Sequence, residues 1–413
     1  MESLSMLLLL GCGCVLTLRL RFIQFRRPFA ALRTLGRRAP DGGVSPFEAL
    51  ATSLGACIGT GNIAGVAGAI LLGGPGALLW MWLSAFVCSA SKYAEIYFAQ
   101  RLGGSPMDYM ERGLPKRLRF LSPAYALCCM AGCVCMGNLV QVNTVAEAVQ
   151  SIAAPYDLRL YAGLLIAALT ALVTFGGARR VGRAAAFLVP FMSALYILGA
   201  LAVILAHLPA LPAALAAIFR GAFMPRALTG GAVGFAAAFR TGMSRGVFTH
   251  EAGVGTAALA HGAVKGNHPH AQALLGVFEV FFDTIVLCSL TGLAILVSGV
   301  PLPYGDASVN SALVIEAFQG VLGGAAGPFI AGSLALFAFT SILSFSLYGT
   351  ICAERLFGRK ARLPFRLAFC LLLIAGALLS PALAWRATET LNALLAVING
   401  AALLLLSRRR GGG

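Results

Sequence analysis

The stretch Gly55-Ala-Cys-Ile-Gly-Thr-Gly-Asn-Ile-Ala-Gly65 interrupts one membrane-length apolar segment, and Arg240-Thr-Gly-Met-Ser-Arg-Gly-Val-Phe-Thr-His-Glu-Ala-Gly253 interrupts a second. Glycine lowers helix propensity and polar side chains are costly in hydrocarbon, so neither favours an unbroken spanning helix. The pattern predicts two broken helices whose freed backbone carbonyls and amides line an ion or substrate site near the bilayer midplane. Such a site is typical of a secondary transporter.

The composition is that of a polytopic membrane protein. Of the 413 residues, 59% are hydrophobic and 11% are charged, whereas soluble domains carry about 25% charged residues. Because roughly 20 apolar residues span a bilayer, the apolar stretches predict eleven helices. These helices lie at approximately residues 2–20, 46–72, 75–101, 123–153, 158–176, 181–206, 231–262, 270–299, 326–357, 362–384 and 388–407. We expect one transmembrane domain over residues 1–413, because no polar stretch is long enough for a soluble domain.

The predicted helices divide into two halves that each begin with an interrupted helix. Residues 2–20 form an extra N-terminal helix, and the other ten helices fall into five at 46–206 and five at 231–407. An odd number of spans in each half gives the halves opposite orientations in the membrane, which is the geometry of an inverted repeat. The connecting segment 207–230 contains three prolines and is expected outside.

The net charge of +16 reflects the loops rather than a nucleic-acid surface. Most Arg and Lys residues gather in alternate predicted loops, as they do in cytoplasmic loops. This bias predicts an N-terminus outside and a cytoplasmic C-terminus. The high Ala, Arg and Gly content suits a GC-rich bacterial genome, so we expect a bacterial plasma membrane. Helices separate the basic residues and aromatics do not interleave them, which argues against nucleic-acid binding.

Polar residues inside the predicted helices are the candidate site residues. Thr60 and Asn62 lie between the glycines of the first break, where the alternative interpretation is small-residue helix packing. Asp283 lies deep in the eighth predicted helix, where it binds a cation, relays a proton or pairs with a base. Lys92 and Glu95, three residues apart, are expected to pair with each other. The other candidates are Arg245, His250 and Glu251 (of which Arg245 and Glu251 alternatively form an internal pair), Asn138, Gln141 and Asn143 (whose amides either bind substrate or join helices), Glu279, and Thr340, Ser341, Ser344 and Ser346.

Catalytic and metal-binding motifs are missing from the sequence. His250-Glu251 lacks the second histidine of a metalloprotease helix, since residue 254 is Val. The densest cysteine run lacks Cys-x-x-Cys spacing and a nearby His, so buried thiols are favoured over a metal site; it comprises Cys128, Cys129, Cys133 and Cys135. We expect no enzyme activity and no cofactor.

Several stretches in both halves are distinctive. They are Gly59-Thr-Gly-Asn-Ile-Ala-Gly65, Gly73-Gly-Pro-Gly-Ala-Leu-Leu-Trp-Met-Trp82, Gly137-Asn-Leu-Val-Gln-Val-Asn143, Arg245-Gly-Val-Phe-Thr-His-Glu-Ala-Gly253 and Phe282-Asp-Thr284. Together they resemble the alanine or glycine:cation symporter family over essentially the whole chain. The resemblance implies an all-α, LeuT-type 5+5 inverted repeat with one extra N-terminal helix. It also implies a symporter that couples inward movement of sodium, or of protons, to uptake of a small neutral amino acid such as alanine or glycine.

The resemblance further implies where the ligands bind. The substrate would lie between the two broken helices, the fourth helix and the ninth, with its carboxylate near backbone groups at Thr60 and Gly61. The implied substrate-binding residues are Thr60, Gly61, Asn138, Gln141, Gly246, Phe248, Thr249, His250 and Phe345. Sodium, the co-transported ion, is a hard cation that binds several oxygen ligands. The resemblance implies that its ligands are Gly55, Ile58, Asn62, Asp283, Thr340 and Ser341.

The chain departs from the family pattern near this implied site. Members usually have Ser-Asn where this chain has Thr249-His250, Trp in place of Phe345 and Glu in place of Thr350. Glu279 stands where members tend to have a small residue. A roomier pocket with a titratable imidazole predicts either a different amino acid or a proton that takes part in coupling. The alternative function is an amino-acid sensor that keeps the fold but carries little flux.

Overall fold

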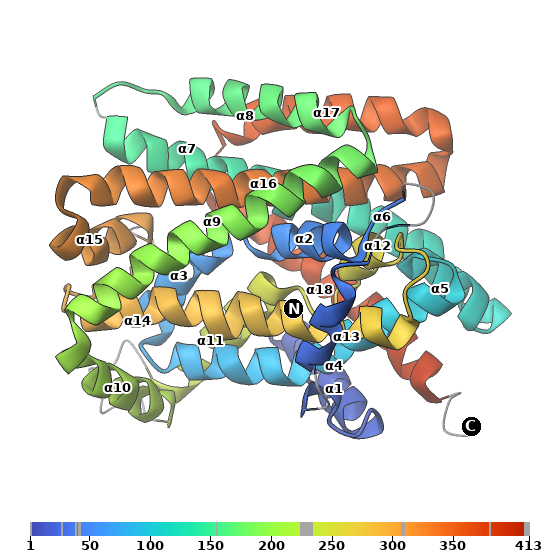
Figure 1. Cartoon of the computed structure of the whole chain (residues 1–413), viewed down its shortest axis with the longest axis horizontal. Coiled ribbons are helices and arrows are strands. Elements are labelled where there is room, and N and C mark those ends of the chain that lie inside the picture. Colours follow the sequence, from blue (N-terminus) through green and yellow to red (C-terminus); the bar gives the residue numbers. More distant parts are fainter. Residues whose placement is uncertain are drawn as a thin grey trace.

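The computed structural model describes residues 2–25, 28–37, 39, 43–153, 155–223, 234–306, 310–379 and 381–408. Within these ranges the chain is helical, apart from turns, loops and one isolated parallel bridge between Val44 and Val264. Figure 1 shows a bundle whose long helices run mostly along one direction. Short helices α10 (Leu211–Phe223) and α15 (Asn310–Leu322) lie at one end of the bundle, and α5 (Pro106–Gly113) lies at the other.

Five helical stretches among the described residues are long and apolar enough to cross a membrane by length and composition. They are Lys116–Gln150, Ala178–Ala206, Pro269–Val297, Asn310–Phe357 and Thr390–Arg408. Shorter apolar helices include Leu7–Arg19, Ala64–Gly73, Arg159–Thr174 and Leu208–Phe223. A broken helix cannot supply an uninterrupted stretch of this length. The two segments with predicted breaks, 46–72 and 231–262, are accordingly not among these five stretches.

The first predicted break is present. It divides α2 (Pro46–Cys57) from α3 (Ala64–Gly73), with a single 3₁₀ turn at Thr60–Asn62 between them. Every residue from 49 to 71 is buried. The unwound backbone is therefore surrounded by protein, which is the condition under which irregular backbone is tolerated at membrane depth.

The second predicted break is also present. It divides α11 (Phe235–His250) from the single short helix α12 (Ala257–His261). The chain turns through left-handed backbone at Glu251, Gly253 and Gly255, where φ is 50°, 96° and 94°. Glycine adopts this conformation at little steric cost, so the two glycines allow the helix to end here.

Two other predicted spans are bulged rather than broken. The fourth consists of α6 (Leu121–Val134) and α7 (Val140–Ala153), joined by a π-helical turn at Cys135–Leu139. The eighth consists of α13 (Pro269–Val280) and α14 (Ser289–Val297), joined by a π-helical segment at Phe281–Cys288. Such bulges occur frequently at functional sites. Here they contain two candidate site residues, Asn138 and Asp283.

The remaining predicted spans are continuous helices. They are α1 (Glu2–Arg19), α4 (Ala77–Leu102), α8 (Arg159–Thr174), α9 (Ala178–Ala206), α16 (Ala326–Phe357), α17 (Arg362–Gly376) and α18 (Pro381–Arg408). The last two differ from the predicted ranges 362–384 and 388–407, because the chain turns after Gly376 and Pro381 begins the final helix, a position that proline favours. The sequence did not predict α5, α10 or α15. Residues 231–233 of the predicted second half and 224–230 of the connecting segment lie outside the described residues.

Candidate functional site

The first break presents backbone groups next to a glutamine of α7. The amide of Thr60 donates to Gln141 Oε1 at 3.1 Å, and the amide of Gly59 donates to Asn62 Oδ1 at 3.0 Å. Thr60 Oγ1 is buried and has no hydrogen-bond partner. A buried hydroxyl without a partner costs free energy, and a ligand bound at the break would supply the missing hydrogen bond.

Four elements meet around this break. A Cβ at Gly61 would lie 3.1 Å from the Phe248 ring and 3.1 Å from Thr249 Cγ2, so glycine allows α11 to approach the break. A Cβ at Gly137 would lie 2.1 Å from Phe345 Cβ, so the bulge before α7 closes directly onto the α16 aromatic ring. The structure therefore brings together most of the predicted substrate residues, namely Thr60, Gly61, Gln141, Phe248, Thr249 and Phe345.

Three predicted substrate residues point elsewhere. Asn138 Nδ2 donates to the Phe369 carbonyl of α17 at 2.7 Å, although Asn138 Oδ1 is buried without a partner. Gly246 packs against α4, where a Cβ would lie 2.1 Å from Ser84 Oγ. His250 also faces α4, because its Nε2 lies 3.3 Å from Ser84 Oγ.

The hydrogen bonds of His250 define its tautomer. Its Nδ1 accepts from the Ala252 amide at 3.0 Å, so the ring proton of a neutral imidazole is assigned to Nε2. Nε2 can then donate to Ser84 Oγ, whose own proton goes to the Met81 carbonyl at 2.7 Å. Both ring nitrogens are occupied within the protein, so the imidazole orients α11 on α4.

One oxygen cluster lies between the end of α2 and α16. Ser341 Oγ is 3.3 Å from the Ile58 carbonyl and 3.4 Å from the Ala56 carbonyl. The last carbonyls of a helix have no intrahelical partner, which makes the end of α2 a source of oxygen ligands. Sequence reasoning missed Ala56, and this general property of helix ends could have found it.

Two predicted sodium ligands flank that cluster. A Cβ at Gly55 would lie 3.4 Å from Thr340 Cβ, so these two residues are neighbours. Thr340 Oγ1 itself donates to the Phe337 carbonyl at 2.9 Å and lies 3.4 Å from Met192 Sδ. Its oxygen lone pairs remain available to a cation, since these two contacts use the hydroxyl proton.

A second oxygen cluster surrounds Asn62 and Asp283. Asn62 Nδ2 donates to Asp283 Oδ1 at 2.7 Å, and Thr284 Oγ1 donates to Asp283 Oδ2 at 2.9 Å. The Asn62 carbonyl accepts from Thr291 Oγ1 at 2.8 Å. Among the described residues Asp283 takes part in no ion pair. A buried carboxylate that lacks a cationic side chain is a candidate cation ligand.

The predicted Lys92–Glu95 pair is not formed. Lys92 Nζ instead lies 3.2 Å from Glu279 Oε2, with both side chains fully buried. Glu95 Oε1 accepts from Asn399 Nδ2 at 2.9 Å. The prediction from spacing along one helix was therefore wrong, because Lys92 and Glu95 each contact a residue of another helix.

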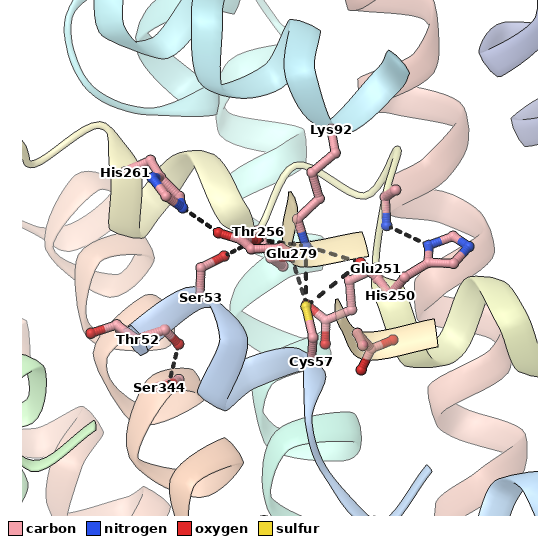
Figure 2. Close-up of polar contacts among 12 residues, drawn as sticks. Thr52, Ser53, Cys57, Lys92, His250, Glu251, Thr256, His261, Glu279 and Ser344 are labelled. Carbon is pink, nitrogen blue, oxygen red and sulfur yellow. Dashed lines mark hydrogen bonds and ion pairs between the residues drawn. The ribbon is translucent and has the colours of Figure 1, made fainter. Parts of the chain in front are cut away.

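Lys92 connects the ends of both broken helices, as Figure 2 shows. Its ammonium donates to the carbonyl of His250, the last residue of α11, at 2.9 Å and to Cys57 Sγ, on the last residue of α2, at 3.1 Å. The C-terminal end of a helix carries partial negative charge. A positive charge is thus placed where both half-helices end.

Glu279 receives donors from three other elements (Figure 2). Ser53 Oγ of α2 donates to Oε2 at 2.8 Å, Lys92 of α4 forms the ion pair, and His261 Nε2 of α12 contacts Oε1. Gln272 Nε2 holds His261 Nδ1 at 2.5 Å. The carboxylate is satisfied on both oxygens, which is the condition for a stable buried charge.

Chelating clusters are absent from the part of the chain that the structure describes. It contains no group of three or more His, Cys, Asp or Glu residues that could hold a metal ion. The candidate ligands are instead carbonyl, hydroxyl, amide and single carboxylate oxygens. Such oxygen sets suit a hard monovalent or divalent cation.

Known proteins resemble the chain over its whole length. A model of the sodium:alanine symporter family matches residues 1–410. The sodium/alanine symporter AgcS of Methanococcus maripaludis is 39% identical over 417 residues, which cover 97% of this chain and 91% of AgcS. The probable sodium/glutamine symporter GlnT of Bacillus subtilis is 34% identical over 419 residues, which cover 98% of this chain and 86% of GlnT.

A solved structure has the same fold. MhsT in complex with L-phenylalanine superposes with a TM-score of 0.64 at 16% identity, over 90% of each chain. At this identity the likeness concerns the fold alone. It confirms the predicted all-helical LeuT-type architecture. The family match, together with the apolar helices, indicates a multi-pass membrane protein.

Proposed function

Because the chain belongs to the sodium:alanine symporter family, we propose that it uses an inward sodium gradient to take up a small neutral amino acid such as alanine or glycine. The observation that carries the proposal is the first break. There the buried Thr60 hydroxyl has no hydrogen-bond partner in the protein, and the carbonyls of Ala56 and Ile58 gather at one hydroxyl, Ser341 Oγ. An unwound segment with both features can hold an amino acid on one side and a cation on the other.

The substrate carboxylate would bind at Thr60 and Gly61. These residues precede α3, and the N-terminal end of a helix attracts anions through its free amides and its dipole. Phe248 and Phe345 would limit the side chain of the amino acid, since both rings pack against glycines of the site. This geometry favours a small apolar or weakly polar side chain.

Sodium would bind between α2 and α16, at the carbonyls of Gly55, Ala56 and Ile58 and the hydroxyls of Thr340 and Ser341. Asn62 and Asp283 would supply a second cation position. An ion that fixes the break also fixes the amides that hold the substrate. Each ligand then raises the affinity of the other by the same factor, as linkage requires.

Alternating access would follow from motion of one bundle around this site. In our proposal the residue ranges 46–206 and 231–407 are two inverted repeats that rock about the break. The N-terminus would lie outside and the C-terminus in the cytoplasm of a bacterial plasma membrane, as the loop charges indicate.

The test is uptake of radiolabelled alanine into proteoliposomes with and without an inward sodium gradient, with glycine, serine and glutamine as competitors. We expect accumulation above the equilibrium level only when sodium is higher outside. Sodium-driven flux of a competitor without alanine flux would reassign the substrate. Binding without flux of any amino acid would establish the sensor function instead. The absence of both binding and flux would refute the proposal.

A further inference from the structure

A hollow between α1, α4 and the end of α18 has no role in the proposed transport cycle. Its volume is about 520 Å³, which is within the usual range of small-molecule sites, roughly 300–1,000 Å³. Its lining includes the apolar side chains of Leu16 and Leu20, from the first helix and its following turn, and of Ala94 and Phe98 of α4, together with the cationic side chains of Arg19 and Arg408. The lining is therefore amphipathic, because it combines apolar and cationic side chains.

The arginines around this hollow form no ion pair with a carboxylate of the described residues. Arg19 NH1 donates to the Leu404 carbonyl at 2.9 Å and to Ser407 Oγ at 2.5 Å, which are both neutral acceptors. Nearby Arg101 donates to Tyr97 OH at 3.1 Å and lies over the Tyr97 ring. Among the described residues no ion pair includes Arg19, Arg101 or Arg408.

Several exposed arginines elsewhere in the chain do pair with carboxylates. Arg159 binds Asp157 at 2.8 Å, and Arg362 binds Glu354 at 2.6 Å. The hollow thus differs from those surfaces in keeping its guanidinium groups available to an external anion. Such a set of guanidinium groups is the side-chain chemistry that recognises phosphate.

The position of the hollow along the helices identifies the depth of the membrane that it faces. Arg19 is the last residue of α1 and Arg408 is the last residue of α18, so both mark the ends of apolar helices. Apolar helices end where the hydrocarbon layer meets the headgroups. The anions that are concentrated at this depth are lipid phosphates.

From these observations we propose that the hollow binds one anionic glycerophospholipid. The lipid phosphate contacts Arg19 and Arg408, and the first carbons of an acyl chain lie along Leu16 and Leu20. In this arrangement the extra N-terminal helix acts as one wall of a lipid site and ties the end of α18 to α4. The site is independent of the proposed amino-acid and sodium binding.

The proposal is tested by native mass spectrometry of the purified full chain, titrated with phosphatidylglycerol and in parallel with phosphatidylcholine. A surface arginine contributes roughly a fivefold gain in affinity for an anionic lipid. We expect one saturable phosphatidylglycerol, and Arg408→Gln should weaken its binding by about fivefold. Phosphatidylcholine should not saturate the same position. Arg408 has no ion pair or hydrogen bond to a described residue, so this variant should fold normally.

Two further variants distinguish a lipid site from a general effect of positive charge. Arg220→Gln, on α10 at the opposite end of the bundle, removes the same charge and should leave phosphatidylglycerol binding unchanged (Figure 1). Arg19→Gln should weaken binding as Arg408→Gln does, although it also removes two contacts to α18. Unchanged binding in Arg408→Gln, equal binding of phosphatidylcholine, or full displacement of the lipid by inorganic phosphate at equal concentration would each overturn the proposal.

Discussion

Replacing Lys92 by methionine removes a fully buried ammonium from the place where both broken helices end. Methionine is unbranched and flexible, so the packing of the side-chain stem is largely kept. The substitution leaves the Glu279 carboxylate, which is also fully buried, without its ion pair to Lys92. Among the described residues, His261 is then the remaining ion-pair partner of Glu279. Removing one partner of a buried pair costs about 3–5 kcal/mol of stability. We expect a loss in this range for Lys92→Met.

A double-mutant cycle isolates the ion pair from the other contacts of Lys92. Glu279→Gln keeps an oxygen that can accept from Ser53 or His261, but it leaves the Lys92 ammonium unpaired. Replacing both charged partners removes the unpaired charge that each single variant leaves behind. The double variant Lys92→Met/Glu279→Gln should therefore be more stable than the sum of the single losses predicts, by about 2–3 kcal/mol.

The measurement is the free energy of unfolding of the purified full chain in detergent micelles, from chemical denaturation of the wild type and the three variants. Lys265→Met is the matched control, because Lys265 is exposed and a surface substitution should change stability by no more than about 0.5 kcal/mol. Additive losses, with a coupling free energy below about 0.5 kcal/mol, would refute the reasoning that the pair acts as a unit.

The same variants separate charge pairing from positioning. Lys92 also donates to the carbonyl at the end of α11, and glutamine at position 279 does not replace that hydrogen bond. If the hydrogen bond from Lys92 to the His250 carbonyl keeps the second break in the conformation that transport requires, the double variant regains stability but not sodium-driven uptake. Full recovery of both would mean that the ammonium serves only to neutralise Glu279.

Further predictions concern the site itself. Asn62→Ala should abolish uptake while expression is kept, because Asn62 Oδ1 accepts from Gly59 and its Nδ2 binds Asp283; normal uptake in proteoliposomes would remove Asn62 from the site. Ser341→Ala should raise the sodium concentration for half-maximal uptake by about ten- to a hundredfold, since a polar contact to a charge is worth about 1.5–3 kcal/mol. Thr350→Ala on the same helix, whose hydroxyl donates to the Ser346 carbonyl of that helix, should not, and equal shifts would contradict the assignment. Gly137→Ala should block uptake because its Cβ would lie 2.1 Å from Phe345 Cβ, and Phe345→Ala should partly restore it; a fully active Gly137→Ala would show that the contact is not required.

The broken helices were predictable because their cause is local. Glycines and polar residues in the middle of an apolar segment weaken the helix wherever the segment lies, and both breaks occur where the sequence placed them. The π-helical segments at Cys135–Leu139 and Phe281–Cys288 were not predicted. Their residues include one glycine, Gly137, and the polar residues Asn138, Asp283 and Thr284, but not the repeated glycines of the two breaks, so the sequence did not distinguish a bulge from a continuous helix.

The candidate residues were predictable as a group but not one by one. Thr249 and His250 are adjacent on a helix, where neighbouring side chains point about 100° apart. Thr249 therefore contacts the first break through Gly61, whereas His250 faces Ser84 of α4. The proposal that His250 contributes a proton to coupling stays a prediction, and the occupied ring nitrogens give the residue a positioning role that sequence alone did not suggest.

The partner of Lys92 shows why charge pairs are harder to predict than breaks. Spacing along α4 favoured Glu95, but a buried ammonium is stabilised by whichever carboxylate the fold places beside it. Glu279 stands out in the sequence because a small residue is usual there in the family that the chain resembles. Here its carboxylate joins α13 to Ser53 of α2 and to His261 of α12 as well as to Lys92. Any movement that carries α2 away from α13 must therefore break a contact to a buried charge, and the Glu279 contacts thereby favour the arrangement in which the end of α2 is held against α13.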